Sequence, residues 1–95
     1  MGQRAQLKPV RLAVKLLTIR QKLGLSQSQL AKLLDFQIKV SVPRVSEYEH
    51  GTREPGLCML LRYARLIGVP VDVLIDDDLD LPETIKLKRR RRTRT

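Results

Sequence analysis

The sequence contains one cysteine, one histidine and no tryptophan, and aromatic residues make up only 3% of its 95 positions. The single cysteine, Cys58, excludes a disulfide within the chain. One cysteine and one histidine are also too few for a structural zinc site, which takes about four such ligands. Hydrophobic residues still make up 42% of the chain, so the core must consist mainly of Leu, Val and Ile, which suits packed helices.

Other features are missing as well. No apolar run approaches the roughly 18 residues that a membrane span requires. The first ten residues, MGQRAQLKPV, contain no apolar signal-peptide core. The chain also has no glycine-rich phosphate loop and no apolar helix with paired carboxylates, so the ingredients of an enzyme site are scarce. These absences predict a soluble, cytoplasmic chain with no membrane contact, no metal, no cofactor and no enzymatic activity.

The net charge of +9 is concentrated at one end of the chain. Residues 86–95, KLKRRRRTRT, contain seven of the 19 Lys and Arg residues and no acid, which leaves +2 for the rest. The excess charge suggests a polyanionic partner, but it is weak support for nucleic-acid binding by the folded part. The basic run either contacts DNA phosphates without reading sequence or serves as a disordered, solubilising tail.

Apolar residues recur at helical spacing, and Ser, Pro or Gly bounds each helical segment. The predicted helices run from about Pro9 to Leu23, from Gln27 to Leu34, from Val42 to about His50, from Gly56 or Leu57 to Ile67, and within residues 71–77. The predicted N-caps are Ser26 and Ser41, and the predicted helix-ending glycines are Gly24, Gly51 and Gly68. In the fourth segment the apolar stripe is predicted to be Leu57, Leu60, Leu61, Ala64 and Ile67.

The predicted fold class is all-α, a compact bundle of four to five short helices. Residues 35–40 are predicted to be a loop, because a short strand there would have no partner strand. Along the chain we expect a polar arm at residues 1–8, a helical domain at 9–78, and an acidic-to-basic tail at 79–95. The composition of this tail favours an unpacked, flexible segment.

Three ordered motifs sharpen this interpretation. They are IRQKLGLSQSQLAKLL, VSVPRVSEYEHGTREP and LLRYARLIGVPVDVLI. Together they resemble the phage-repressor and Cro family (XRE-like) of helix-turn-helix regulators over roughly residues 12–76. The resemblance implies a lambda-repressor-like DNA-binding domain in a bacterial or phage-encoded regulator. It further implies sequence-specific binding of double-stranded DNA, with repression as the expected outcome and the helix at about 41–50 in the major groove.

The base-reading positions of the family fall on Val42, Pro43, Arg44 and Glu47. Arg44 suits guanine, because a guanidinium can donate two hydrogen bonds to O6 and N7. Glu47 has three possible roles: accepting from a cytosine amine, orienting Arg44 one turn away, or repelling other bases. At 100° per residue, the side of this helix that faces the bundle carries Val45, Tyr48 and Glu49.

The resemblance also implies positioning and scaffold roles. Phosphate contacts, which fix register without reading sequence, are expected at Ser26, Gln27, Ser41, Ser46, Thr52 and Arg53. Gln27 would bind a phosphate with help from the positive end of its helix. Arg20 and Glu49 match positions that form a buried ion pair in the family, which assigns them to the scaffold.

The sequence departs from the family pattern in two places near this helix. The connector before it is about four residues longer than usual, with Asp35 where a turn glycine is common, and His50 replaces an asparagine. These departures leave the helix-turn-helix class intact, and no operator sequence is carried over from the family. A homodimer on a two-fold symmetric site is a further hypothesis, with Leu79, Leu81 and Ile85 as its apolar contacts. The alternative function is an antitoxin or adaptor whose bundle mainly binds a partner protein.

Overall fold

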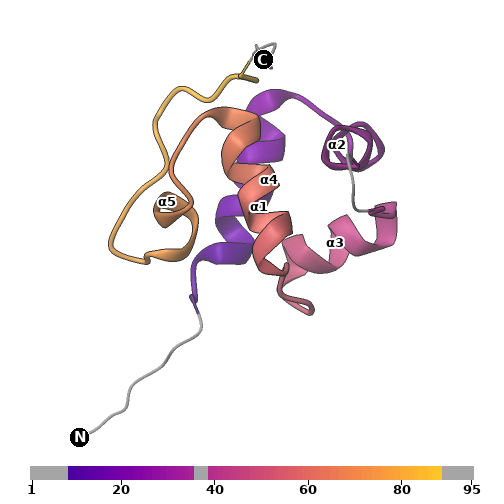
Figure 1. Cartoon of the computed structure of the whole chain (residues 1–95), viewed down its shortest axis with the longest axis horizontal. Coiled ribbons are helices and arrows are strands. Elements are labelled where there is room, and N and C mark those ends of the chain that lie inside the picture. The colour runs from indigo at the N-terminus through magenta and orange to yellow at the C-terminus, as the bar shows by residue number, and fades with distance from the viewer. Residues whose placement is uncertain (1–8, 36–38, 89–95) are drawn as a thin grey trace, which may run out of the picture.

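A computed structural model of the chain describes residues 9–35 and 39–88. These residues form five helices and no strand, which confirms the all-α class. The helices are α1 (Leu12–Leu23), α2 (Gln27–Leu34), α3 (Val42–His50), α4 (Leu57–Ile67) and α5 (Asp72–Ile75). In Figure 1, α1 and α4 form the centre, with α2 and α3 on one side and α5 on the other. The predicted arm at 1–8, residues 36–38 of the connector and residues 89–95 of the basic run at 86–95 lie outside the described residues.

The helix ends follow the local signals in the sequence. Ser26 caps α2 by accepting from the backbone N–H of Gln29, whose side chain accepts in turn from the backbone N–H of Ser26. Ser41 caps α3 by accepting from the backbone N–H of Arg44. The glycines that end α1, α3 and α4 all adopt the left-handed conformation, with φ between 71° and 77°. That conformation is costly for any residue with a Cβ, which explains glycine at these three positions.

The start of α1 differs from the sequence prediction. The helix begins at Leu12 and not near Pro9, and its N-cap residue Arg11 makes no capping hydrogen bond with its own side chain. The carboxylate of Asp77 takes this role from the far end of the domain, because its two oxygens accept from the backbone N–H groups of Val10 and Arg11, both at 3.0 Å. A remote side chain therefore sets the helix start.

The core joins all five helices. Its buried hydrophobic residues are Leu12, Leu16, Ile19, Leu30, Ala31, Leu34, Val45, Tyr48, Met59, Leu60, Tyr63, Ala64, Leu74 and Ile85. The predicted stripe of α4 is partly wrong: Leu57 is 84% exposed and Leu61 is also exposed, while Met59 and Tyr63 point inward instead. Burial raises the pKa of the Tyr63 hydroxyl, so this side chain stays neutral within the core.

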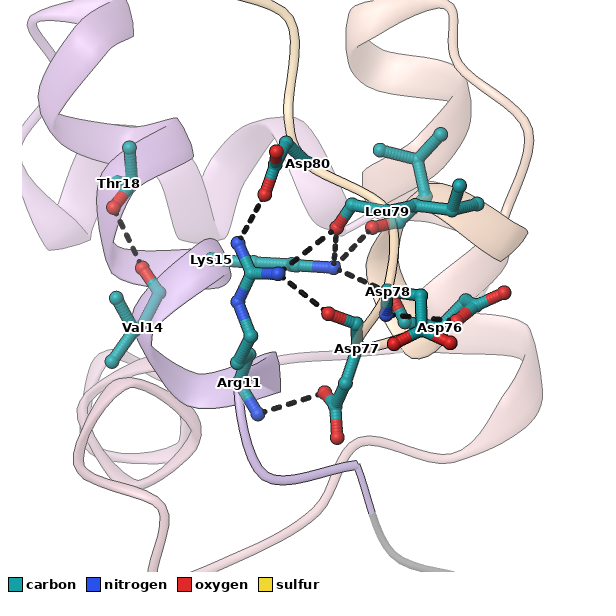
Figure 2. Close-up of polar contacts among 10 residues, drawn as sticks. Arg11, Val14, Lys15, Thr18, Asp76, Asp77, Asp78, Leu79 and Asp80 are labelled. Atoms are coloured by element: carbon teal, nitrogen blue, oxygen red, sulfur yellow. Dashed lines mark hydrogen bonds and ion pairs between the residues drawn. The ribbon is translucent and has the colours of Figure 1, made fainter.

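Lys15 is one of two charged residues that are buried among the described residues, with 3% of the residue exposed; the other is Glu49. Its ammonium donates to the backbone carbonyls of Val73, Asp76 and Leu79 at 2.7, 3.0 and 2.8 Å (Figure 2). Burial, with Arg11 nearby, lowers the pKa of Lys15. The three carbonyls use all three protons of the ammonium, so α1 is tied both to α5 and to the turn that follows it.

The segment from residue 79 to residue 88 packs against the bundle, which differs from the unpacked segment that its composition suggested. Ile85 is 8% exposed and belongs to the core. The backbone N–H of Lys88 donates to the carbonyl of Leu66 at 2.7 Å, and Nζ of Lys22 donates to the carbonyl of Glu83 at 2.6 Å. The folded unit therefore continues about ten residues beyond Asp78.

Among the helices of the described residues, the longest of which has 12 residues, none is long and apolar enough to cross a membrane. No group of three or more His, Cys, Asp or Glu side chains in residues 9–35 and 39–88 is placed to hold a metal ion.

Candidate nucleic-acid interface

The third helix has a fixed inner side and an open outer side. Val45, Tyr48 and Glu49 are buried, and α3 packs against both α1 and α2. Val42, Pro43 and Arg44 are exposed, and Glu47 is half-buried. Pro43 lies in the first turn, where the backbone N–H groups have no partner within the helix, so a proline is tolerated there. The four positions expected to read bases therefore lie on a solvent-facing surface.

The inner side is held by the ion pair that the resemblance implied. Nε of Arg20 donates to Oε2 of Glu49 at 2.7 Å and its Nη2 donates to Oε1 at 3.1 Å, which makes the pair bidentate. The Arg20 side chain also reaches the carbonyl of Leu25 at 2.9 Å. Both partners are largely shielded from water, and together they fix α3 to α1 and to the turn before α2.

Gln27 joins this cluster. Its side-chain amide donates to Oε1 of Glu49 at 3.0 Å, so Glu49 links α1, α2 and α3. A glutamine amide has two N–H groups. The scaffold contact uses one of them, and the other remains as the donor for the phosphate contact expected here. Ser26, beside it, is exposed at the start of α2.

The outer side of α3 carries a three-residue charge cluster, consisting of Arg44, Glu47 and Arg53. Oε1 of Glu47 lies 3.3 Å from Nε of Arg44 and 2.9 Å from Nε of Arg53. All three side chains are between 43% and 50% exposed. The contact with Arg44 was one of the three roles considered for Glu47, whereas the contact with Arg53 was not foreseen.

The chain after α3 is folded back onto Glu47. The backbone carbonyl of Glu47 accepts from the backbone N–H groups of Thr52 and Arg53, at 3.0 and 3.4 Å. The Thr52 hydroxyl also donates to this carbonyl, at 3.4 Å. Gly51 makes this return possible because it takes the left-handed conformation at the end of the helix. The two candidate phosphate contacts, Thr52 and Arg53, therefore lie next to the candidate base-reading surface.

The family assignment follows from a comparison with known proteins. The family model described as a helix-turn-helix, of the Cro/C1 type, matches residues 16–74, which is more than half of the chain. The chain belongs to the Cro/C1-type helix-turn-helix family. This family is non-enzymatic, and its domain implies DNA binding and a part in transcription. No curated protein and no solved structure matches the chain.

The connector of this helix-turn-helix protein is long. Residues 35–41 separate α2 from α3, whereas the turn of such a motif typically has about three or four residues. Asp35 ends α2 with φ −81° and ψ 76°, outside the left-handed region. A glycine is therefore not required at this position, which explains the departure from the usual pattern.

Lys39 is a cation near α3 that the sequence-based assignment of the interface missed. With Val40, Ser41 and Arg44 it lines a hollow of about 240 Å³ at the start of α3. Its ammonium is 3.4 Å from a carboxylate oxygen of Asp35, and its side chain is 91% exposed. The sequence indicates a role for Lys39 only through its position, two residues before the N-cap Ser41.

The remaining candidate positions have polar partners within the helix. The hydroxyl of Ser46 is 3.3 Å from Nδ1 of His50, and this nitrogen is 2.8 Å from the carbonyl of Ser46. Ser41 uses its oxygen as an acceptor for the cap of α3, which leaves its hydroxyl proton as a donor. The hydroxyl of Ser41 can therefore cap the helix and contact a phosphate at the same time.

Proposed function

We propose that this helix-turn-helix protein is a sequence-specific regulator of transcription that acts as a repressor. In this proposal α3 enters the major groove of double-stranded DNA and no cofactor is needed. The observation that carries it is the division of α3 into two sides. Its inner side is fixed by Val45, Tyr48 and the Arg20–Glu49 pair, while its outer side is open. A rigid helix whose exposed outer side carries both charged and apolar residues suits insertion into a groove.

The residues of the outer side divide by chemistry. Arg44 recognises a base through hydrogen bonds, since a guanidinium can donate to both O6 and N7 of guanine. Val42 and Pro43 supply apolar contact, of the kind that a thymine methyl group accepts. Glu47 completes the base-contacting set. The phosphate-contacting set comprises Ser26, Gln27, Ser41, Ser46, Thr52 and Arg53, and these contacts fix the register of the protein on the duplex.

Selection of bound duplexes from a random DNA pool tests this proposal. A conserved motif of a few base pairs among the selected sequences is the expected result. On the selected site, Arg44→Ala should relax the preference at one base pair, because a bidentate contact contributes about 1–3 kcal/mol of discrimination. Arg53→Ala should weaken binding to all sequences alike. Uniform loss of affinity in both variants contradicts the division between reading and positioning.

A homodimer on a two-fold symmetric site is part of the same proposal. Two of the three apolar residues considered for its interface are used within the protomer, since Ile85 is buried and Leu81 is half-buried. Leu79 remains exposed, and so does Leu57 on α4, at 84%. Sedimentation of the protein with and without the selected duplex gives the stoichiometry.

The second candidate function is binding of a partner protein, as in an antitoxin or adaptor. The observation that favours it is the exposed apolar pair Leu57 and Leu61 on α4, which the core leaves unused. Absence of any enriched motif in the selection, together with tight binding to a co-encoded protein, would replace the regulator with this function. With either function, we expect a bacterial or phage-encoded protein that acts in the cytoplasm.

A further inference from the structure

Glu47 is the only carboxylate that α3 exposes, since the other acid of this helix, Glu49, is buried in the ion pair with Arg20. Its Oε1 atom contacts both Nε of Arg44, at 3.3 Å, and Nε of Arg53, at 2.9 Å. The two arginines come from different elements, α3 and the segment after it. An anionic oxygen shared by two guanidinium groups is the same kind of ligand that a DNA phosphate offers to them.

We propose that Glu47 is a specificity-determining residue of this interface. It competes with DNA phosphates for Arg44 and Arg53, and it thereby weakens binding to every sequence that gives Arg44 no base to contact. This inference rests on the proposed function, because it names how the same surface discriminates between DNA sequences.

On a non-matching sequence the two arginines have only phosphates as partners. To reach them, the arginines must leave Glu47, and the carboxylate then lies close to the phosphates without a cationic neighbour. Like charges at short distance repel, and more strongly where DNA has displaced water. Glu47 therefore imposes a cost on non-specific binding, the part of DNA affinity that comes mostly from Lys and Arg.

On a matching sequence the contact between Glu47 and Arg44 can persist. Glu47 touches Nε of Arg44, so the terminal nitrogens remain available for O6 and N7 of a guanine. The carboxylate also holds the Arg44 side chain along the outer side of α3, which reduces the conformational freedom lost on binding. The cost of Glu47 is then offset at the matching site and at no other.

Three substitutions separate this role from a general charge effect. Glu47→Gln removes the charge with little change of shape, and Glu47→Asp keeps the charge but shortens the side chain, so that it no longer reaches both arginines. Glu54→Gln is the matched control, since Glu54 is an exposed acid of the same region and lies outside the cluster. Affinity is measured for the selected duplex and for a random duplex of equal length over a series of salt concentrations, with the melting temperature of each variant.

Glu47→Gln should raise affinity for the random duplex and lower the ratio of specific to non-specific affinity by about tenfold. The slope of log K against log salt for the random duplex should become steeper by about 1. Glu47→Asp should also lower the ratio, although its charge is unchanged, and Glu54→Gln should leave the ratio as it is.

Three results overturn the inference. One is an equal change of both affinities in Glu47→Gln, which assigns the effect to net charge alone. Another is a wild-type ratio in Glu47→Asp, which shows that the contact with both arginines is not needed. The third is a fall in the ratio that is as large in Glu54→Gln as in Glu47→Gln. A failure of the proposed function looks different, because the wild-type protein then selects no motif at all.

Discussion

The carboxylate of Asp77 accepts the backbone N–H of Arg11 at 3.0 Å, across 66 positions of the sequence. The same carboxylate accepts from Val10, while the Arg11 side chain donates to the carbonyl of Asp77 at 2.6 Å and to the carboxylate of Asp80 at 2.7 Å. Figure 2 shows that Lys15 lies beside these hydrogen bonds and that its ammonium reaches the same turn. The start of α1 and the segment after α5 therefore depend on each other for their polar contacts.

Asp77 makes the stability of this contact dependent on pH. The hydrogen bonds from the backbone N–H groups of Val10 and Arg11 lower the pKa of its carboxyl group. A carboxyl group whose pKa is lowered by folding stabilises the protein at pH values above its unfolded pKa, which is about 3.9 for Asp. This contribution disappears as the pH falls through the folded pKa. Asp77→Asn should therefore lower the melting temperature at pH 7, and its difference from the wild-type protein should shrink below about pH 4.

The matched control for this variant is Asp78→Asn, because Asp78 is exposed and its carboxylate makes none of the contacts to α1 described above. It should leave the melting temperature nearly unchanged at both pH values. A gap between Asp77→Asn and the wild-type protein that stays constant from pH 7 to pH 3 would show that the charge of Asp77 is not responsible.

Lys15 should contribute more to the free energy of unfolding than a lysine at the protein surface does. Lys15→Met keeps most of the side-chain length but leaves three carbonyl groups without their donor. Leaving buried acceptors unpaired costs about 1–3 kcal/mol, so the free energy of unfolding in urea should fall by that amount. Lys22→Met is the comparison, since Lys22 contacts one carbonyl at the surface, and a change within about 0.5 kcal/mol is expected. Equal effects of the two substitutions would contradict the special role of Lys15.

The features that the sequence predicted well are local ones. Ser26, Ser41 and the three helix-ending glycines act on groups within a few residues, so their patterns predict the helix ends directly. The prediction of the buried stripe of α4 was partly wrong because it depends on contacts that are not local. Leu57 and Leu61 fit helical spacing as well as Met59 and Tyr63 do, and only the position of the other helices decides which pair is buried.

Long-range contacts explain the other differences. The start of α1 depends on Asp77, and the packing of Ile85 depends on a core assembled from all five helices. Within the candidate interface, the exposed residues of α3 followed from its helical periodicity and from the resemblance. The contact between Arg53 and Glu47 could not be predicted in this way, because it crosses the end of α3 and depends on the left-handed turn at Gly51.

The Arg20–Glu49 pair should behave as a unit in the scaffold. Arg20→Met leaves the Glu49 carboxylate buried, with Gln27 as its remaining side-chain partner among the described residues, and removing one member of a buried pair typically costs about 3–5 kcal/mol. Replacing both members, as in Arg20→Met with Glu49→Leu, should cost less than the sum of the two single changes. A double-mutant cycle of unfolding free energies measures this coupling, and strict additivity would show that the two side chains do not interact.

Ile85 tests whether the segment after Asp78 belongs to the folded unit. Ile85→Ala removes apolar atoms from a core position, and such changes cost about 2–5 kcal/mol. Leu87→Ala is the control within the same segment, because Leu87 is 47% exposed and its truncation should change stability by less than about 0.5 kcal/mol. Urea unfolding of the full chain distinguishes the two cases. If both substitutions had small effects, the core would end with α5; a large effect of Ile85→Ala alone requires that residues 79–88 fold together with the helices that present α3.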